Sequence, residues 1–222
     1  MTIFEGLQRL RACGFHPHAI LDVGAYEGWF ARLCRTVWPT SYILMVDALP
    51  EKEDVLFATC QEIGNAEYKI ALLGDTEAEN VPFFVARGTS QLGPNQTGSS
   101  KYKENTGVPI EELHLPQETL DRLSIDNGRV FDFLKLDIQG AELEVLAAAP
   151  TVLKHAEVVL LEISLLEFNA GAPLIADVLN SMQRWGFILW DIADLSRLGT
   201  HLNQIDGLFV RPDSPLRLKL RR

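Results

Sequence analysis

Short runs of β-branched and aliphatic residues alternate with amphipathic stretches along the 222 residues of this sequence. This alternation constrains the fold more than any other feature, because strands that alternate with helices form parallel βαβ units. The run at 156–163 is apolar at nearly every position, which is typical of a strand with both faces covered. We therefore predict an α/β fold with a single doubly wound, mostly parallel sheet and helices on both of its faces.

The individual elements follow from these periodicities and from their start and stop signals. Strands are expected at 19–23, 41–47, 68–72, 131–137, 156–163, 187–191 and 206–211, with further extended segments at 81–86 and 108–115. Helices are expected in the lead-in 1–18 and at 30–38, 50–63, 118–123 and 174–185. One more helix follows residue 137, with Leu143, Leu146 and Ala147 on its inward face.

Length and composition are those of one globular domain over 1–222, since 47% of the residues are hydrophobic and no linker or repeat interrupts the chain. The formal net charge of −10 disfavours nucleic acid and anionic lipid as partners. The three cysteines form no CxxC pair, which favours reduced thiols. The charged first fifteen residues are unlike a signal peptide, and no apolar run is long enough to span a membrane. We predict a cytoplasmic protein; the oligomeric state has no signal in the sequence.

The first strand passes through Asp22 into a turn with Gly24 and Gly28, and a helix follows. Glycines at such a turn let the backbone approach a ligand closely, and the helix presents its N–H groups to that ligand. A plain connection between strand and helix would need only one glycine. The carboxylate of Asp22 suits a cationic ammonium, and Asp47 ends the second strand, where an acidic side chain accepts hydrogen bonds from ribose hydroxyls. The pattern predicts a cofactor that contains a nucleoside.

The glycine spacing separates two classes of cofactor. A nicotinamide dinucleotide site uses G-x-G-x-x-G, in which the glycines allow a pyrophosphate to come close. This chain has G-x-x-x-G, and Glu27 adds negative charge beside the turn. S-adenosylmethionine carries an adenosine, an amino acid and a sulfonium but no phosphate, so it fits this turn better than NAD.

Two segments resemble a known family. The run DVGAYEGWF at 22–30 looks like the first motif of Rossmann-type class I methyltransferases, and LKLDIQGAE at 134–142 closely resembles the signature of the FkbM-type family. That family comprises S-adenosylmethionine-dependent O-methyltransferases that act on hydroxyls of sugars and natural products. The resemblance extends over about 20–210, and it implies a seven-stranded sheet of order 3-2-1-4-5-7-6 with an antiparallel last strand. The family usually has asparagine where this chain has Tyr26.

The expected cofactor site gathers the glycine turn and the carboxyl ends of neighbouring strands, where ligands bind in open α/β sheets. S-adenosyl-L-methionine is the predicted cofactor. The predicted cofactor-binding residues are Asp22, Gly24, Ala25, Tyr26, Gly28, Asp47, Ala48, Leu72 and Asp137.

Methyl transfer to a neutral alcohol needs a general base or a metal ion that helps the hydroxyl lose its proton. Asp137 ends its strand and is the first candidate, although an aspartate there also caps helices. Glu162 ends the next strand, and together with Asp137 it could hold a divalent cation, an arrangement that we do not favour over a structural carboxylate. Glu142 is included because of the family signature, since it otherwise only complements a helix dipole. The predicted catalytic residues are Asp137, Glu142 and Glu162, and no metal ligand is assigned.

Residues 87–107 are polar and too long for an ordinary loop. We predict a mobile lid over the cofactor and over a small-molecule or glycan hydroxyl acceptor. Lys101, Tyr102 and Lys103 either contact that acceptor or form a solvated tip. Three alternatives to O-methylation stay open: N-methylation of a small molecule or protein, an NAD-dependent oxidoreductase, and a non-catalytic cofactor-binding module.

Overall fold

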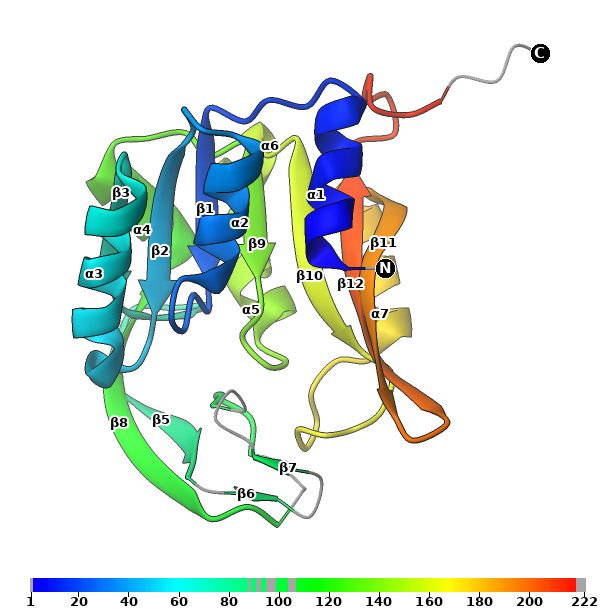
Figure 1. The fold of residues 1–222 in the computed structure, drawn as a ribbon. Coiled ribbons are helices and arrows are strands. Elements are labelled where there is room, and N and C mark those ends of the chain that lie inside the picture. Colours follow the sequence, from blue (N-terminus) through cyan, green and yellow to red (C-terminus); the bar gives the residue numbers. More distant parts are fainter. Residues whose placement is uncertain (1, 88, 91–92, 95–98, 104–106, 219–222) are drawn as a thin grey trace.

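The structure is a computed structural model, and it describes residues 2–87, 89–90, 93–94, 99–103 and 107–218. A seven-stranded sheet lies at its centre, in the order β3-β2-β1-β9-β10-β12-β11 (Figure 1). Strand β12 pairs antiparallel with both of its neighbours, whereas the other pairs of neighbours in this sheet are parallel. The strands are β1 (Ala19–Val23), β2 (Tyr42–Asp47), β3 (Ala66–Ile70), β9 (Phe133–Leu136), β10 (Val158–Ser164), β11 (Ile188–Leu198) and β12 (His201–Val210). The predicted fold class and the strand order implied by the family resemblance are therefore confirmed.

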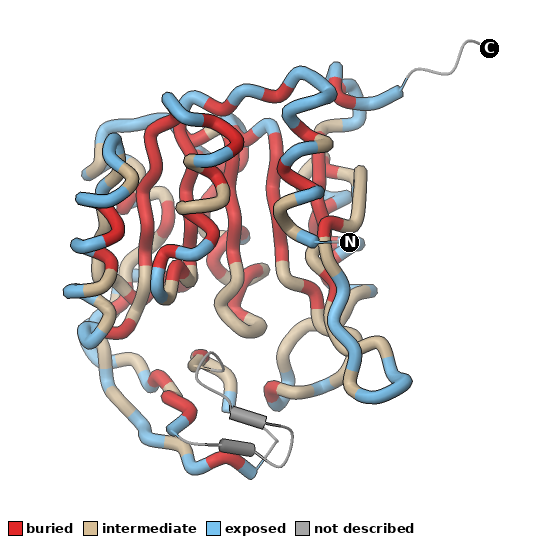
Figure 2. Tube along the Cα trace, viewed as in Figure 1, coloured by how far each residue is buried: buried red, intermediate tan, exposed pale blue. Residues whose placement is uncertain are grey.

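Helices cover both faces of the central sheet (Figure 1). One face packs against α1 (Ile3–Ala12), α2 (Trp29–Val37) and α3 (Glu53–Ile63), which follows the short 3-10 helix η1 (Pro50–Lys52). The other face packs against α4 (Leu120–Asn127), α5 (Glu142–Ala147), α6 (Pro150–His155) and α7 (Ile175–Arg184). Since both faces are covered, β1 is buried at each of its five positions, and the central strands form the buried layer in Figure 2.

An aromatic cluster fixes β9 against the helices on one face. The fully buried ring of Phe133 makes edge-on contacts with Phe15, Phe30 and Trp38, at centroid distances of 5.7–5.9 Å. Such pairs contribute about 0.5–1.5 kcal/mol each beyond the area that they bury. The cluster therefore holds the strand that carries the second family motif beside β1.

The third strand lies two residues earlier than predicted, because its pairing with β2 ends where Asp47 meets Ile70. Leu72 begins a separate strand, β4 (Leu72–Gly74), which pairs with β8 (Ile110–Thr119). Strand β8 also pairs with β5 (Ala78–Ala86), and this smaller sheet lies beyond the carboxyl ends of the parallel strands (Figure 1). Two short strands, β6 (Thr89–Ser90) and β7 (Gly93–Pro94), pair within the predicted lid.

Two helices differ from the prediction. Helix α4 begins after Thr119, whose hydroxyl accepts a hydrogen bond from the Arg122 amide, so it starts two residues later than expected. Helix α5 buries Val145 and Leu146, whereas the predicted inward residue Ala147 is exposed. Helix α6, which begins at Pro150, was not predicted. Proline interrupts the interior of a helix, but it is also favoured at the first position of a helix.

The hairpin of β11 and β12 is longer than predicted. Its outer part includes Ser196 and Arg197, which are exposed and carry no apolar alternation. Where one face of an antiparallel pair is exposed to solvent, the strand no longer reads as a continuous apolar run, so its end is not predicted from apolar residues. None of the helices in the described part of the chain is long and apolar enough to cross a lipid bilayer.

Candidate active site

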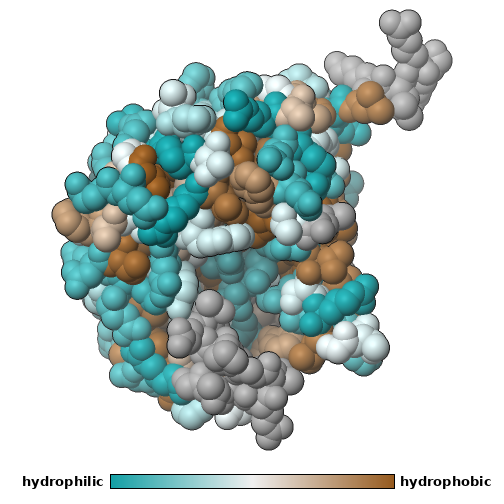
Figure 3. Space-filling view, in the orientation of Figure 1, coloured by the Kyte–Doolittle hydropathy of each residue, from teal (hydrophilic) through white to brown (hydrophobic). Residues whose placement is uncertain are grey.

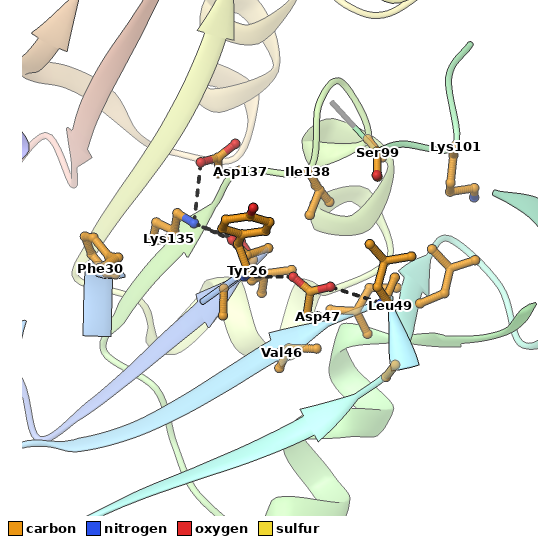
Figure 4. A pocket seen from close by; sticks show the side chains of 18 of the residues that line it. Tyr26, Phe30, Val46, Asp47, Leu49, Ser99, Lys101, Lys135, Asp137 and Ile138 are labelled. Atoms are coloured by element: carbon orange, nitrogen blue, oxygen red, sulfur yellow. Dashed lines mark hydrogen bonds and ion pairs between the residues drawn. The ribbon is translucent and has the colours of Figure 1, made fainter. Parts of the chain in front are cut away.

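A cavity of about 240 Å³ lies at the carboxyl edge of the central sheet, between the turn after β1, the end of β2 and the loop after β9 (Figure 4). The space-filling view shows this side of the molecule hollowed, with hydrophilic residues deep in the hollow (Figure 3). The predicted residues that line the cavity are Gly24, Ala25, Tyr26, Asp47, Ala48, Leu72 and Asp137. The predicted residues that do not line it are Asp22, Gly28, Glu142 and Glu162.

Asp47 is the last residue of β2, and its carboxylate forms part of the cavity wall. Oδ2 accepts a hydrogen bond from the Tyr26 amide at 2.8 Å, and Oδ1 accepts one from the Leu49 amide at 3.0 Å (Figure 4). Burial raises the pKa of Asp47 above its usual value, and the two amide hydrogen bonds oppose this rise. Each carboxylate oxygen has a further lone pair, so this fixed group can accept hydrogen bonds from two adjacent hydroxyls.

The two glycines of the turn are required by the packing of the protein itself. The φ angle is +74° at Gly24 and +73° at Gly28, in the left-handed region that suits glycine. A Cβ atom on Gly24 would lie 1.9 Å from the carbonyl oxygen of Asp137, and one on Gly28 would lie 2.6 Å from the side chain of Thr59. The close approach of a ligand, which the sequence analysis inferred from these glycines, is not needed to explain them.

The backbone N–H groups of the same turn bond inside the protein. The amides of Gly24 and Ala25 both donate to the carbonyl of Val46, at 2.9 and 3.0 Å, and the Gly28 amide donates to the carbonyl of Ala25 at 2.7 Å. The Tyr26 amide donates to Asp47. A phosphate-binding turn points such groups at its ligand. These four amides therefore do not form a phosphate cradle.

The backbone at Tyr26 has a left-handed conformation, which fits the asparagine that the resemblance implies at this position. Its φ angle is +52°, and asparagine is one of the few residues besides glycine that readily adopt this conformation. In this chain the Tyr26 ring faces the ammonium of Lys52, whose Nζ lies 3.5 Å from the ring centroid. A cation–π contact of this kind contributes about 0.5–1 kcal/mol and offsets part of the backbone strain.

Asp22 is fully buried within β1, and its carboxylate faces Lys135 on the neighbouring strand β9. Lys135 Nζ lies 3.1 Å from Asp22 Oδ1, donates to the carbonyl of Gly24 at 2.9 Å, and lies 3.6 Å from Asp137 Oδ2. Burial lowers the pKa of Lys135, but Asp22 and Asp137 outweigh it and raise this pKa above its usual value. No role was predicted for Lys135, although a single cation inside an apolar strand indicates one.

Gln139 connects the two carboxylates that were predicted to lie together. Its Nε2 donates to Asp137 Oδ1 at 3.1 Å and to Glu162 Oε2 at 2.7 Å. Asp137 lines the cavity, whereas Glu162 lies behind this amide. Within the described residues, no group of three or more His, Cys, Asp or Glu side chains is placed to hold a metal ion.

Glu142 holds the loop after β9 through hydrogen bonds to the backbone of that loop. Its side chain is buried, its Oε1 accepts a hydrogen bond from the Ile138 amide at 2.8 Å, and its Oε2 accepts one from the Gly140 amide at 3.0 Å. Burial raises the pKa of Glu142 to about 7. Because Glu142 does not reach the cavity, its geometry is that of a residue that positions the loop carrying Asp137.

Two further buried carboxyls lie beside this loop. Glu162 and Asp206 face each other across the β10–β12 pair. Burial, followed by repulsion from Asp137, raises the pKa of both groups, in the case of Asp206 to about 7. Several carboxyl groups near the carboxyl edge of the sheet therefore have raised pKa values.

We expect the stability of the protein to fall as the pH rises from about 4 to about 7. Asp206 stays protonated in the folded protein while it ionises in the unfolded chain, so the folded state holds more protons in this range. The free energy of unfolding then falls by at most about 1.4 kcal/mol per pH unit for each such group. Asp206→Asn should be more stable than the parent protein at pH 8, by on the order of 2 kcal/mol, and the difference should shrink at pH 5.

Urea unfolding at both pH values measures this difference. Asp126→Asn is the matched control, because its carboxylate is 43% exposed and an exposed ion pair contributes little to stability. An Asp206→Asn effect that is the same at pH 5 and pH 8 would contradict the prediction.

Ser100 and Lys101 of the predicted lid contact the loop after β9 and helix α5, which follows it. Ser100 Oγ donates to the carbonyl of Gln139 at 2.8 Å, and Lys101 forms an ion pair with Glu144. Ser99 and Lys101 line the cavity, so Lys101 is held in the site and is not part of a solvated tip. The rest of the predicted lid includes 88, 91–92, 95–98 and 104–106, which lie outside the described residues. The mobility of this segment stays a prediction.

Solved structures that share this fold include several methyltransferases. Precorrin-6y C5,15-methyltransferase from Geobacter metallireducens GS-15 aligns with a TM-score of 0.53 at 12% identity, over 94% of this chain and 87% of that protein. Magnesium protoporphyrin IX methyltransferase from Synechocystis PCC 6803, with bound SAM, gives 0.53 at 13% identity, over 94% and 77%. The N-terminal domain of EvdMO1, in the presence of SAH and D-fucose, gives 0.53 at 11% identity, over 95% and 83%. At identities this low, the alignments show that the fold is shared and show nothing further about function.

The family follows from the sequence. No curated protein matches this chain. The family model of the methyltransferase FkbM domain matches residues 22–189, which is more than half of the chain. The matched region contains the turn after β1, the Asp47 carboxylate and the loop that carries Asp137. This chain therefore belongs to the FkbM domain family of methyltransferases.

Proposed function

We propose that this chain is an S-adenosylmethionine-dependent O-methyltransferase that acts on a hydroxyl group of a sugar or natural product. The turn after β1 distinguishes between the two cofactor classes. The amides of Gly24, Ala25, Tyr26 and Gly28 are bonded inside the protein, while Asp47 lines the cavity. A cofactor with a ribose and no phosphate meets both conditions, whereas NAD needs N–H donors for its pyrophosphate. Leu49, Leu72 and Phe83 form an apolar part of the cavity wall, which suits an adenine ring.

The proposed chemistry uses Asp137 as the base. When bound, S-adenosylmethionine supplies a methyl group on a positively charged sulfur. Asp137 faces the cavity, and the hydrogen bond from Gln139 orients its carboxylate. In our proposal, this carboxylate accepts the hydroxyl proton while the oxygen–methyl bond forms and the sulfur–methyl bond breaks.

The acceptor is proposed to bind between the loop after β9 and the predicted lid. Ser99 and Lys101 extend the cavity wall on this side. Closing the segment 87–107 over the acceptor would exclude water from the reaction. The similar fold of EvdMO1, solved in the presence of D-fucose, supports including sugars among the acceptors to be tested.

Calorimetry with S-adenosylmethionine and with NAD tests the cofactor class, and binding of NAD alone would refute the proposal. Formation of S-adenosylhomocysteine is then measured with acceptors that carry either a hydroxyl or an amine. Turnover with amines only would indicate N-methylation. Cofactor binding without turnover on any acceptor would favour a non-catalytic module.

Asp47→Asn should weaken S-adenosylhomocysteine binding by about 10–100-fold, since a charge-assisted hydrogen bond contributes about 1.5–3 kcal/mol. Calorimetry measures the affinity, and thermal unfolding without ligand shows whether the turn survives the loss of one acceptor. Glu53→Gln is the matched control, because this carboxylate lies at the start of α3 and does not line the cavity. An unchanged affinity in folded Asp47→Asn would place the ribose elsewhere.

A further inference from the structure

Lys135 is a buried cation in contact with the cavity. Its side chain is 8% exposed, and it lies on β9 between strands β1 and β10. Burying an ammonium is costly unless anions and hydrogen bonds compensate it. The Asp22 carboxylate supplies one such anion, and the two groups are adjacent across the β1–β9 pair. Lys135 also lines the cavity, so its charge acts on whatever binds there.

The third N–H group of the ammonium has only a long hydrogen bond, to the carbonyl of Val23 at 3.4 Å. A protonated lysine has three donors. Of these, one reaches the carbonyl of Gly24 at 2.9 Å, and Asp22 Oδ1 lies at 3.1 Å. The remaining oxygens around Nζ are more distant, with the carbonyl of Val23 at 3.4 Å and Asp137 Oδ2 at 3.6 Å. An anion in the cavity would be a better partner than either of these two oxygens.

The two ends of the cavity differ in chemistry. Figure 4 shows Lys135 and Asp47 on opposite sides of Tyr26. Beyond Asp47 the wall is apolar, with Leu49 and Leu72, and suits the adenine. If the ribose binds at Asp47 and the adenine at the apolar wall, the amino-acid part of the cofactor would lie on the side of Lys135. That part carries the only carboxylate of S-adenosylmethionine.

We propose that Lys135 binds the carboxylate of the methionine part of the cofactor. This inference rests on the proposed function and adds a binding residue to it. Asp22, which was predicted to attract the cofactor's ammonium, instead balances the charge of Lys135 from inside the sheet. The ammonium of Lys135 therefore reaches the cavity, whereas the Asp22 carboxylate of the same pair does not line it.

Two ligands distinguish binding of the cofactor carboxylate by Lys135 from a purely structural role of Lys135 in supporting the turn after β1. S-adenosylhomocysteine carries the carboxylate, whereas 5′-methylthioadenosine lacks the amino acid and keeps the ribose and adenine. Lys135→Met should weaken S-adenosylhomocysteine binding by about 10–100-fold and change 5′-methylthioadenosine binding by less than about threefold. Calorimetry with both ligands gives the ratio of affinities without any need for turnover.

Lys135→Met alone leaves the Asp22 carboxylate buried without its partner and can unfold the protein. The double variant Asp22→Asn/Lys135→Met removes both charges and should show the same loss for S-adenosylhomocysteine alone. Asp22→Asn by itself should keep the affinity ratio of the parent protein. Lys52→Met is the matched control, because Lys52 lies on the Tyr26 ring but does not line the cavity.

An equal loss of affinity for both ligands would overturn the proposal and make Lys135 a support for the turn. Unchanged binding of S-adenosylhomocysteine by the folded double variant would overturn it as well. Failure of the parent protein to bind S-adenosylhomocysteine would instead overturn the proposed function itself.

Discussion

Asp137→Asn should lower kcat by about 10²–10⁴-fold and leave the affinity for S-adenosylhomocysteine within a few-fold of the parent value. Asparagine keeps an oxygen at the position that accepts the Gln139 hydrogen bond, so the loop is preserved. It cannot accept a proton from the acceptor, so the chemical step loses its base. Formation of S-adenosylhomocysteine measures turnover, and calorimetry measures the affinity.

Asp206→Asn is the matched control for charge at the same edge of the sheet. It removes a carboxyl that does not line the cavity, and turnover should stay within a few-fold of the parent. Adding a chelator and then magnesium separates a base from a metal ligand at Asp137. An Asp137→Asn enzyme that stays active and insensitive to the chelator would leave this residue only a structural role.

Gly24→Ala should destabilise the protein by on the order of 4 kcal/mol. Alanine at φ +74° costs about 1–2 kcal/mol by itself. In addition, its Cβ would lie 1.9 Å from the carbonyl oxygen of Asp137, so the turn after β1 and the loop after β9 must separate. Urea unfolding gives the loss of stability, and turnover should fall with it because Asp137 moves.

Gly128→Ala is the matched control for the backbone conformation. Gly128 ends α4 with φ +71°, and no atom lies within 4 Å of the Cβ that it would gain. This variant should therefore lose only the conformational part, about 1–2 kcal/mol. An equal loss in the two variants would show that the contact between Gly24 and Asp137 relaxes without cost.

The interior strands were predictable because both of their faces are buried. Strand β1 has the predicted bounds, β2 lies within its predicted run, and β10 ends one residue beyond its run, since apolar residues must occupy nearly every position there. The smaller sheet was only partly predictable: β5 and β8 extend beyond the expected segments, and Leu72, the first residue of β4, was assigned to the third strand. Their boundaries depend on which partner each strand pairs with, and one-dimensional periodicity does not contain that information.

Only those residues of the active site that belong to a recognisable motif, or that end a strand, were predictable. The family signature and the rule for carboxyl edges pointed to Asp47 and Asp137, and both line the cavity. The same reasoning predicted that Asp22 binds the cofactor, although its carboxylate lies within a buried strand and faces Lys135. Gln139 received no role, because its bridge between two carboxylates depends on a left-handed backbone at its own position.

By itself, the order of apolar runs, glycines and acidic strand ends determined the fold class and the edge of the sheet where the cavity lies, and the two motifs at 22–30 and 134–142 indicated the family. These properties depend on local patterns that recur along the chain. Only the tertiary structure decided which side chains reach the cavity and which lie behind it, because β1, β9 and β10 are brought together from distant parts of the sequence. The charge of a buried group such as Lys135 depends on those neighbours, since burial and opposite charges act on it at distances of a few ångströms.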